Sequence, residues 1–246
     1  MGMANKFSIA YGIAGSLKNQ GAALIFTAQS ERFKEKISDT IAEFSKHDVF
    51  VCDVTNEGEI ERVFKEINDR VGNIDFLVHS IAFSDKNELR GQYSQTTREN
   101  FLNTLNISCY SLTEICRFLP IIMKDGGSVL TLTYYGSEKV VPNYNVMAVA
   151  KSALETSVKY LANDLGEYGI RVNAISAGPI KTLAASGIHE FSKILELERD
   201  RAPLKRNVTQ KDIGDACSFL ISDMASGITG QILHVDCGSS IVGMTI

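Results

Sequence analysis

Two side chains near the middle of the chain have the types and the spacing for acid and electrostatic catalysis. Tyr144 and Lys151 lie seven residues apart in a segment whose pattern predicts a helix that opens near Asn143. At about 100° per residue, this spacing brings both side chains to nearly one helical face, two turns apart. A phenol there can donate a hydrogen bond to a carbonyl oxygen that is becoming negative, and an ammonium can hold the sugar hydroxyls of a cofactor. Taken alone, a tyrosine on an amphipathic helix is more often packing and a lysine more often solvated surface.

The segment before this helix would place the pair at the end of a strand. A β-rich run ends at Tyr134 and Tyr135, Gly136 breaks it, and Pro142 punctuates the loop that follows. In an open parallel sheet, ligands bind outside the carboxyl ends of the strands. The sequence therefore predicts that the pair faces a ligand site at this edge.

Strands and helices alternate along the whole chain. We expect strands at 22–28, 48–54, 74–80, 127–134, 170–176 and 232–236. We expect helices at about 8–20, 31–45, 57–71, 97–121, 144–165 and 210–222, and a helical pattern also runs over 183–201. This alternation, with no repeat and no linker, predicts a single α/β domain, 1–246, built on a doubly wound parallel sheet with helices on both faces.

A doubly wound sheet needs a central first strand ahead of its phosphate-binding turn. The sequence begins at Met1 and Gly2, where that strand should be ending. We therefore expect the leading strand to be missing before Met1.

Composition excludes several classes of protein. The chain has 246 residues, 44% of them hydrophobic, and a net charge of −4 with both signs interspersed, which argues against a partner that is a nucleic acid or an anionic membrane. No apolar run approaches the roughly 18 residues of a membrane span, and no signal peptide is visible. The five cysteines form no CxxC pair, which indicates reduced thiols and a cytoplasmic location, and the four histidines lack the spacing of metal ligands.

Several turns could hold a dinucleotide. Gly2 allows a close backbone approach to a pyrophosphate, while Ser8 and Ile9, at the start of the first helix, supply a hydroxyl and N–H donors. Ser8 is also expected to be the N-cap of that helix. After the second strand, Gln29 stands where an acidic residue would hold the adenosine ribose.

The later strand ends continue this pattern. Asp53 can accept from an adenine amino group with Val54 beside the ring, although Asp53 could equally cap a turn. Ser80 and Ile81 follow the next strand and would let the backbone approach a ribose. The run SAGPIKT at 176–182 presents a rigid turn in which Thr182 can bond a phosphate or a carboxamide and Ile180 can pack on a nicotinamide.

These residues carry a resemblance to a known family. The chain resembles the short-chain dehydrogenase/reductase superfamily and, within it, the NADH-dependent enoyl-acyl-carrier-protein reductases. The matching runs span nearly the whole chain: ANKFSIAYGIA, CDVTNE, DFLVHSIAF, TLTYYG, NYNVMAVAKSALE, GIRVNAISAGPIKTLAASGI and GITGQILHVDCG. General members of the superfamily have Tyr-x-x-x-Lys, but here Met147 stands four residues before Lys151 and the tyrosine is Tyr144. That spacing is typical of the enoyl reductases.

The resemblance implies roles for individual residues. Tyr144 and Tyr134 match the two active-site tyrosines, Lys151 matches the cofactor-binding lysine, and Ser84 matches a substrate contact. The positions that match cofactor contacts are Gly2, Ser8, Ile9, Gln29, Asp53, Val54, Ile81, Ile180, Lys181, Thr182, Leu183 and Ala184. Two departures are visible: Ala148 stands where glycine is common, and the absent first strand puts the pyrophosphate site in doubt.

The resemblance also implies a reaction. NADH would deliver hydride to the β-carbon of a trans-2-enoyl thioester held on acyl carrier protein, the last reductive step of fatty-acid elongation. An apolar tunnel would hold the acyl tail, with wall candidates Tyr134, Met147, Pro179, Ile188, Phe191 and Ile194. The segment 183–201, with small residues at its start, is expected to be a mobile lid.

Assembly and alternatives complete the expectations. Apolar residues on more than one face of the helices at 97–121 and 144–165, and an apolar run at 240–246, predict a homotetramer with two-fold axes. One alternative is a 3-oxoacyl or alcohol dehydrogenase of the same fold, against which Met147 speaks. Another is a non-catalytic dinucleotide-binding sensor, against which the joint presence of Tyr134, Tyr144 and Lys151 speaks.

Overall fold

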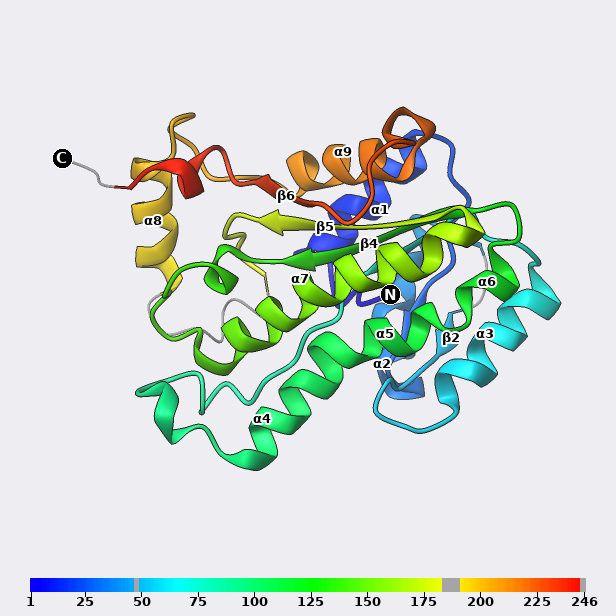
Figure 1. Ribbon diagram of the computed structural model, residues 1–246, viewed down its shortest axis with the longest axis horizontal. Helices are drawn as coiled ribbons and strands as arrows, with labels where there is room; N and C mark the ends of the chain where they lie inside the picture. The colour runs from blue at the N-terminus through cyan, green and yellow to red at the C-terminus, as the bar shows by residue number, and fades with distance from the viewer. Residues whose placement is uncertain (47–48, 183–190, 244–246) are drawn as a thin grey trace.

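The computed structural model describes residues 1–46, 49–182 and 191–243. Its strands are all parallel and form two sheets. The smaller sheet pairs β1 (Thr27–Ala28) with β2 (Phe50–Val51). The larger sheet has the order β3 (Phe76–His79), β4 (Gly127–Thr133), β5 (Ile170–Ala177) and β6 (Ile232–Val235). The predicted parallel α/β architecture is confirmed, with helices on both faces (Figure 1).

The helices lie in two layers. One layer contains α1 (Ile9–Asn19), α2 (Glu31–Ala42) and α9 (Gln210–Ile221). The other contains α3 (Glu59–Arg70), α4 (Arg98–Leu105), α5 (Ser111–Cys116), α6 (Leu119–Ile122) and α7 (Asn145–Leu165). Figure 1 shows α9 and α7 on opposite sides of β4 and β5, with α8 (Phe191–Arg201) beyond the arrowheads of these strands.

Alternate side chains of β4 pack against the two helix layers. Leu130 and Leu132 face the apolar core beneath α1 and α9, while Val129 belongs to the core beneath α5 and α7. Thr131 and Thr133 share the α7 side with Val129, because successive side chains of a strand point to opposite faces. Both hydroxyls are buried, so each needs a polar partner on that side.

The predicted strands at 22–28, 48–54 and 74–80 are longer than the observed ones. Phe26 O accepts from Phe50 N at 3.0 Å, but no ladder forms on the other side of 22–26, where a cavity of about 200 Å³ lies between this segment and 73–78 in the described chain. The backbone of Met1 enters this gap only at its end: its N-terminus donates to Val78 O at 2.9 Å, and Ser80 N donates to Met1 O at 3.2 Å. The ladder is therefore interrupted where the expected leading strand would lie, and the parallel strands form two sheets.

The predicted helix at 97–121 is also divided. A π-helical turn at Asn106–Tyr110 follows α4, and Pro120 at the start of α6 ends the regular pattern after α5. Proline lacks an N–H and clashes with the preceding turn, so it favours a helix start over a helix interior. A helix prediction based on apolar periodicity alone misses this break.

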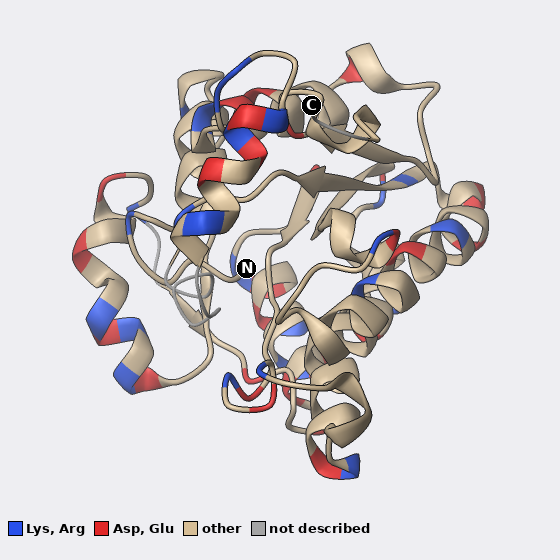
Figure 2. Cartoon of the chain, turned by 90° about the vertical axis from the view of Figure 1, so that its left-hand side faces the viewer, with Lys and Arg blue, Asp and Glu red and all other residues tan. Residues whose placement is uncertain are grey.

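Basic and acidic residues alternate on the outer helices, as Figure 2 shows from the side that carries α8. None of the helices in the described ranges combines the length and the apolar content that a bilayer crossing requires. Within those same ranges, no group of three His, Cys, Asp or Glu residues is arranged to hold a metal ion.

Candidate active site

A cavity of about 740 Å³ opens at the carboxyl ends of β3, β4 and β5. Residues that follow the end of each strand line the cavity, as expected for a parallel sheet, in which ligands bind at the carboxyl ends of the strands. The sequence-predicted residues that line it are Gly2, Ser8, Ile9, Ser80, Ile81, Ser84, Tyr134, Tyr144, Met147, Lys151, Pro179, Ile180, Thr182 and Phe191. One cavity therefore gathers residues from the first turn to α8.

The two tyrosines form one unit in this wall. Tyr134 follows the last residue of β4, and Tyr144 immediately precedes α7. Their ring centroids are 5.0 Å apart at an interplanar angle of 76°, the edge-to-face arrangement that aromatic quadrupoles favour. Burial raises the pKa of both phenols above the ordinary value. Both hydroxyls therefore stay protonated at neutral pH and can act as hydrogen-bond donors.

Tyr144 lies just outside the helix in which the sequence placed it. Asn143 and Asn145 have φ of 61° and 39°, so the chain turns sharply around Tyr144 before α7 begins. Asparagine tolerates this left-handed region better than most residues. The turn still directs the Tyr144 ring into the cavity, with 9% of the residue exposed.

Lys151 reaches the same cavity from α7. It is 6% exposed, and its Nζ donates to Leu132 O at 2.7 Å. Burial lowers the pKa of this ammonium to about 8, while the negative charge of Glu155 acts in the opposite direction. An ammonium has three donors, so the bond to Leu132 leaves donors for a ligand.

A polar network behind Lys151 holds the ends of β3 and β4. His79 is fully buried, with Nδ1 3.0 Å from Thr131 Oγ1 and Nε2 2.8 Å from Ser111 Oγ. Ser111 Oγ also lies 2.7 Å from Ile107 O, and Thr131 Oγ1 lies 3.2 Å from His79 O, so each hydroxyl has a carbonyl acceptor in addition to the imidazole. Burial, followed by the charge of Lys151, lowers the pKa of His79 to about 3, which keeps the ring neutral.

The first turn forms the opposite wall. Ser8 occupies the N-cap position of α1, as predicted, but its side chain makes no capping bond to the helix. Its Oγ instead accepts from the backbone N–H groups of Ala4 and Asn5 at 3.1 and 3.0 Å. The predicted cap position is correct, and the Ser8 hydroxyl bonds to the preceding loop instead of the helix.

Gly2 shows why the first turn has no side chain at that point. Its φ is +93°, and a Cβ there would lie 2.0 Å from Ser80 O. The two loops that follow the sheet gap therefore touch backbone to backbone, and any other residue would clash.

Helix α9 fixes the start of α1 at the cavity. Gln210 Nε2 donates to Ser8 O at 2.6 Å and to Lys6 O at 3.1 Å. A Cβ on Gly12 would lie 2.4 Å from the Gln210 Cβ, so α1 and α9 pack at close range. A capping box between Thr209 and Asp212 starts α9 at this point.

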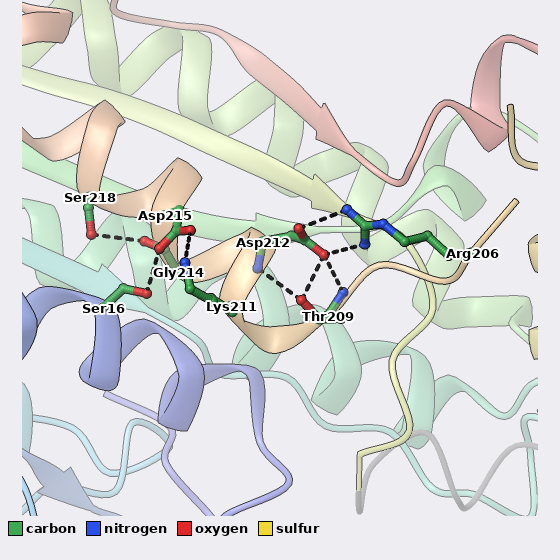
Figure 3. Close-up of polar contacts among 8 residues, drawn as sticks. All are labelled: Ser16, Arg206, Thr209, Lys211, Asp212, Gly214, Asp215 and Ser218. Carbon is green, nitrogen blue, oxygen red and sulfur yellow. Dashed lines mark hydrogen bonds and ion pairs between the residues drawn. The ribbon is translucent and has the colours of Figure 1, made fainter. Parts of the chain in front are cut away.

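Figure 3 shows the other polar contacts that hold α9. Arg206 binds both carboxylate oxygens of Asp212, at 2.7 and 3.0 Å, beside Thr209. Asp215 accepts from Ser16 of α1 at 3.0 Å and pairs with Lys211 at 2.5 Å. These contacts lie outside the cavity and orient the helix that orients the first turn.

Some predicted cofactor residues lie away from the cavity wall. Gln29 Nε2 donates to Asp53 Oδ2 at 3.4 Å, so the ends of β1 and β2 meet. Asp53 Oδ1 accepts from the N–H and hydroxyl of Thr55, which is the turn-capping alternative, while Oδ2 faces Gln29. Val54 is buried beside them, and Lys181 is exposed and outside the lining.

Four other predicted site residues are not among the described residues that line the cavity. Leu183, Ala184 and Ile188 lie outside the described residues. Ile194 lies on α8 but is not part of the cavity wall. The sequence reasoning did not single out the lining residues Asn5, Phe83, Leu89, Leu132 and Thr133. Thr133 could have been found, because it precedes Tyr134 at the end of a predicted strand.

Comparison with known proteins identifies the family of the chain. The model of the family described as enoyl-(acyl carrier protein) reductase matches residues 2–240. The chain belongs to this family.

Curated relatives agree with the family model. The NADH-dependent enoyl-acyl-carrier-protein reductase of Rickettsia typhi is 53% identical over 242 residues, which is 98% of this chain and 93% of the relative. The corresponding protein of Bacillus cereus is 52% identical over 246 residues, 99% of this chain and 96% of the relative.

Solved structures share the fold over the full length. A reductase from Anaplasma phagocytophilum in complex with NAD has a TM-score of 0.96 and 49% identity, and the match covers 100% of this chain and 94% of that one. The Bacillus cereus reductase with NADP+ and an indole naphthyridinone has a TM-score of 0.96 and 50% identity, with coverage of 99% and 96%. The chemistry of this cavity is therefore interpreted as that of an enoyl reductase of fatty-acid synthesis.

Proposed function

We propose that this protein uses NADH to reduce the trans-2 double bond of an enoyl thioester carried on acyl carrier protein. The observation that carries the proposal is the meeting of Tyr134, Tyr144 and Lys151 in one buried wall. Two neutral phenols beside an ammonium are suited to an oxygen that becomes negative during reaction. Conversion of an enoyl thioester to the saturated thioester, followed by mass spectrometry, tests this directly, and an unchanged substrate mass would overturn it.

The residues present fit a dinucleotide. Gly2 lines the cavity at the first turn, and the N-terminus of α1, with Ser8 and Ile9, opens into the same cavity, where its N–H groups could bind a pyrophosphate. Ile180 and Thr182 line the opposite side, at the turn after β5. Gln29 and Asp53 meet at the ends of the neighbouring strands, where an adenosine would reach.

The chain's own groups divide the chemistry. NADH, when bound, supplies the hydride that goes to the β-carbon of the substrate. Tyr144 donates its hydroxyl proton in a hydrogen bond to the thioester oxygen as enolate charge develops there. Lys151 holds the nicotinamide ribose and adds positive potential at the same place. Protonation of the α-carbon then yields the saturated acyl chain.

The acyl end of the cavity is apolar. Met147, Pro179 and Phe191 line it together with Tyr134, and Ser84 supplies a hydroxyl at its side. Ser84 Oγ accepts from Thr104 Oγ1 at 3.0 Å, so its position is fixed by α4. We assign Ser84, Tyr134, Met147 and Phe191 to the substrate.

A lid over the acyl end follows from the position of α8. Phe191 begins this helix and lines the cavity, while Arg201 ends it above the Tyr135 ring at 5.6 Å. Arg201 Nε also donates to Val242 O at 2.9 Å, which anchors the far end of α8. The proposed lid, 183–201, belongs to the single domain 1–246; α8 is its described part, and 183–190 lie outside the described residues.

A homotetramer is the proposed assembly. Of the apolar side chains on the two long helical segments, Leu112, Ile115, Leu154 and Val158 are buried within one subunit and need no partner. Tyr160 on α7 and Leu102 on α4 remain 70% and 60% exposed, and Ile241 near the C-terminus is 81% exposed. Such patches favour self-association about two-fold axes. Light scattering tests this, and a mass near a single 27.0 kDa chain would refute it.

The location proposed for the enzyme is the cytoplasm. All five cysteines are free thiols, and four of them are buried. Reduced cysteines are typical of proteins in a reducing compartment.

A further inference from the structure

Glu155 binds the end of β4 to α7. It lies one turn beyond Lys151 on α7, and the two side chains therefore share a face. Lys151 Nζ donates to Leu132 O at 2.7 Å, and Glu155 Oε1 accepts from Thr133 Oγ1 at 2.5 Å. Consecutive residues at the end of the strand are thus held by consecutive turns of the helix.

The same carboxylate oxygen takes a second donor from beyond the strand. Ser137 Oγ donates to Glu155 Oε1 at 2.5 Å. Its backbone N–H donates to Tyr134 O at 2.9 Å, and its own carbonyl accepts from Ser152 Oγ at 2.9 Å. The short helical turn Tyr135–Ser137 is therefore fixed to α7 at two points.

The two donors flank Tyr134. Thr133 precedes this residue and Ser137 follows it by three, so one carboxylate oxygen closes the backbone around it. The Tyr134 ring in turn packs edge to face on Tyr144. No ion pair of Glu155 is present among the described residues. Its carboxylate accepts from these two hydroxyls, and its negative charge raises the pKa of Lys151.

We propose that Glu155 is a positioning residue for catalysis, which holds the segment around Tyr134 against α7 and thereby sets the Tyr134 ring against Tyr144. It touches neither substrate nor cofactor and acts through Tyr134. This inference rests on the function proposed above. Its physical basis is that a shift of about 1 Å in a catalytic group can cost on the order of 10²-fold in rate.

The chemistry of the contact makes the role specific. Thr133 is 4% exposed, so loss of the acceptor would leave a buried hydroxyl without its partner and free the loop to move. Glutamine keeps an oxygen acceptor at the same distance from the helix, whereas alanine removes it. The positioning role thus needs the acceptor, whereas the charge of Glu155 acts on Lys151. The two substitutions separate these properties when kcat is measured well below pH 8, where Lys151 stays protonated.

The test compares Glu155→Ala with Glu155→Gln, and uses Glu167→Ala, an exposed glutamate beyond the end of α7, as the control. We expect Glu155→Ala to lower kcat by about 10- to 100-fold with the NADH dissociation constant within about twofold of wild type. Glu155→Gln and Glu167→Ala should each keep kcat within about threefold of wild type. The first variant retains an oxygen acceptor at position 155, and the second does not change that position. A wild-type kcat in Glu155→Ala, or equal losses in the Ala and Gln variants, overturns the proposal.

A second variant tests the same contacts if Glu155→Ala does not fold. Thr133→Val with Ser137→Ala removes the same two donors and leaves the carboxylate in place. This double variant should show the same loss of kcat, and wild-type turnover in it would overturn the proposal.

A double-mutant cycle identifies the route of the effect. If Glu155 acts through the Tyr134 ring, then combining Tyr134→Ala, which removes the ring, with Glu155→Ala should lower kcat much less than the product of the two single losses. Strictly multiplicative losses would overturn the inference. Failure of the proposed function is distinguishable, because wild-type protein would then leave both NADH and enoyl thioester unchanged.

Discussion

The rings of Tyr134 and Tyr144 meet edge to face with their centroids 5.0 Å apart, although one follows a strand and the other precedes a helix. This contact places two neutral phenols on one wall of the cavity, close to the ammonium of Lys151. The arrangement gives the substrate oxygen donors that need no reorganisation when charge develops, which is the basis of electrostatic catalysis.

Removing the hydroxyl of Tyr144 should slow the reaction without loosening the cofactor. One lost oxyanion donor typically costs about 10²–10³ in rate, and Lys151 can cover part of this, so we expect turnover of Tyr144→Phe to fall by about ten- to a thousandfold. Steady-state kinetics and NADH fluorescence titration measure the two effects. Wild-type turnover in this variant would remove Tyr144 from the catalytic role.

Lys151 should connect NADH binding to pH. Its ammonium is protonated below its pKa of about 8 and neutral above it, so NADH affinity should decrease as pH rises through that value. In Lys151→Ala binding should be weak at every pH, and in Lys151→Arg, which stays charged, it should be independent of pH in this range. Calorimetric titration at several pH values gives these constants; a flat wild-type profile would show that the charge of Lys151 does not hold the cofactor.

His79 should make the fold sensitive to acid. Its pKa is about 3 in the folded protein against 6.5 as the ordinary value, so the unfolded chain binds a proton that the folded chain refuses when the pH falls below about 6.5. Stability from this group is complete above about pH 7 and decreases as the pH falls toward 3. Between about pH 7 and pH 5 the free energy of unfolding should decrease by about 2 kcal/mol more in wild type than in His79→Gln. Urea unfolding measures this difference, and equal slopes for the two proteins would contradict it.

NADH should be used in preference to NADPH. The adenosine end is marked by the Gln29–Asp53 contact and by Glu31 in the first turn of α2, and carboxylates repel a 2′-phosphate. We expect kcat/KM for NADH to exceed that for NADPH by about tenfold or more, equivalent to roughly 1.4 kcal/mol. Gln29→Arg should narrow the ratio, since a guanidinium can hold the phosphate. A ratio of one in wild type would show that these carboxylates do not select the cofactor.

The sequence predicted the parts of the site that local spacing encodes. The alternation of strands and helices predicted the parallel sheet. The seven-residue spacing predicted that Tyr144 and Lys151 share one site, and both line the cavity although the backbone turns sharply at Asn143 and Asn145. Contacts across long separations carry no such signal. His79 hydrogen-bonds to Ser111, which lies 32 residues later in the chain. Ser111 is positioned by the π-helical turn that precedes it, and the apolar pattern of the sequence does not predict this turn.

The extent of the strands and the α7 contacts depend on other elements for a similar reason. Residues 22–25 have the apolar character of a strand, but the expected leading strand is missing from the gap between them and 73–78 in the described chain. Thr133 looks like an ordinary strand residue until Glu155 is seen to accept from it. Periodicity predicts which face a side chain takes, whereas its polar partner depends on the packing of another element.

The choice between enoyl and 3-oxoacyl reduction is decided by the NADH absorbance of the purified protein given either an enoyl thioester or the matching 3-oxoacyl thioester on acyl carrier protein. We expect rapid loss of absorbance with the enoyl substrate and about none with the 3-oxoacyl substrate, because Tyr134, Tyr144 and Lys151 together stabilise an enolate oxygen. Oxidation of NADH by the 3-oxoacyl substrate alone, or by neither, would contradict this expectation.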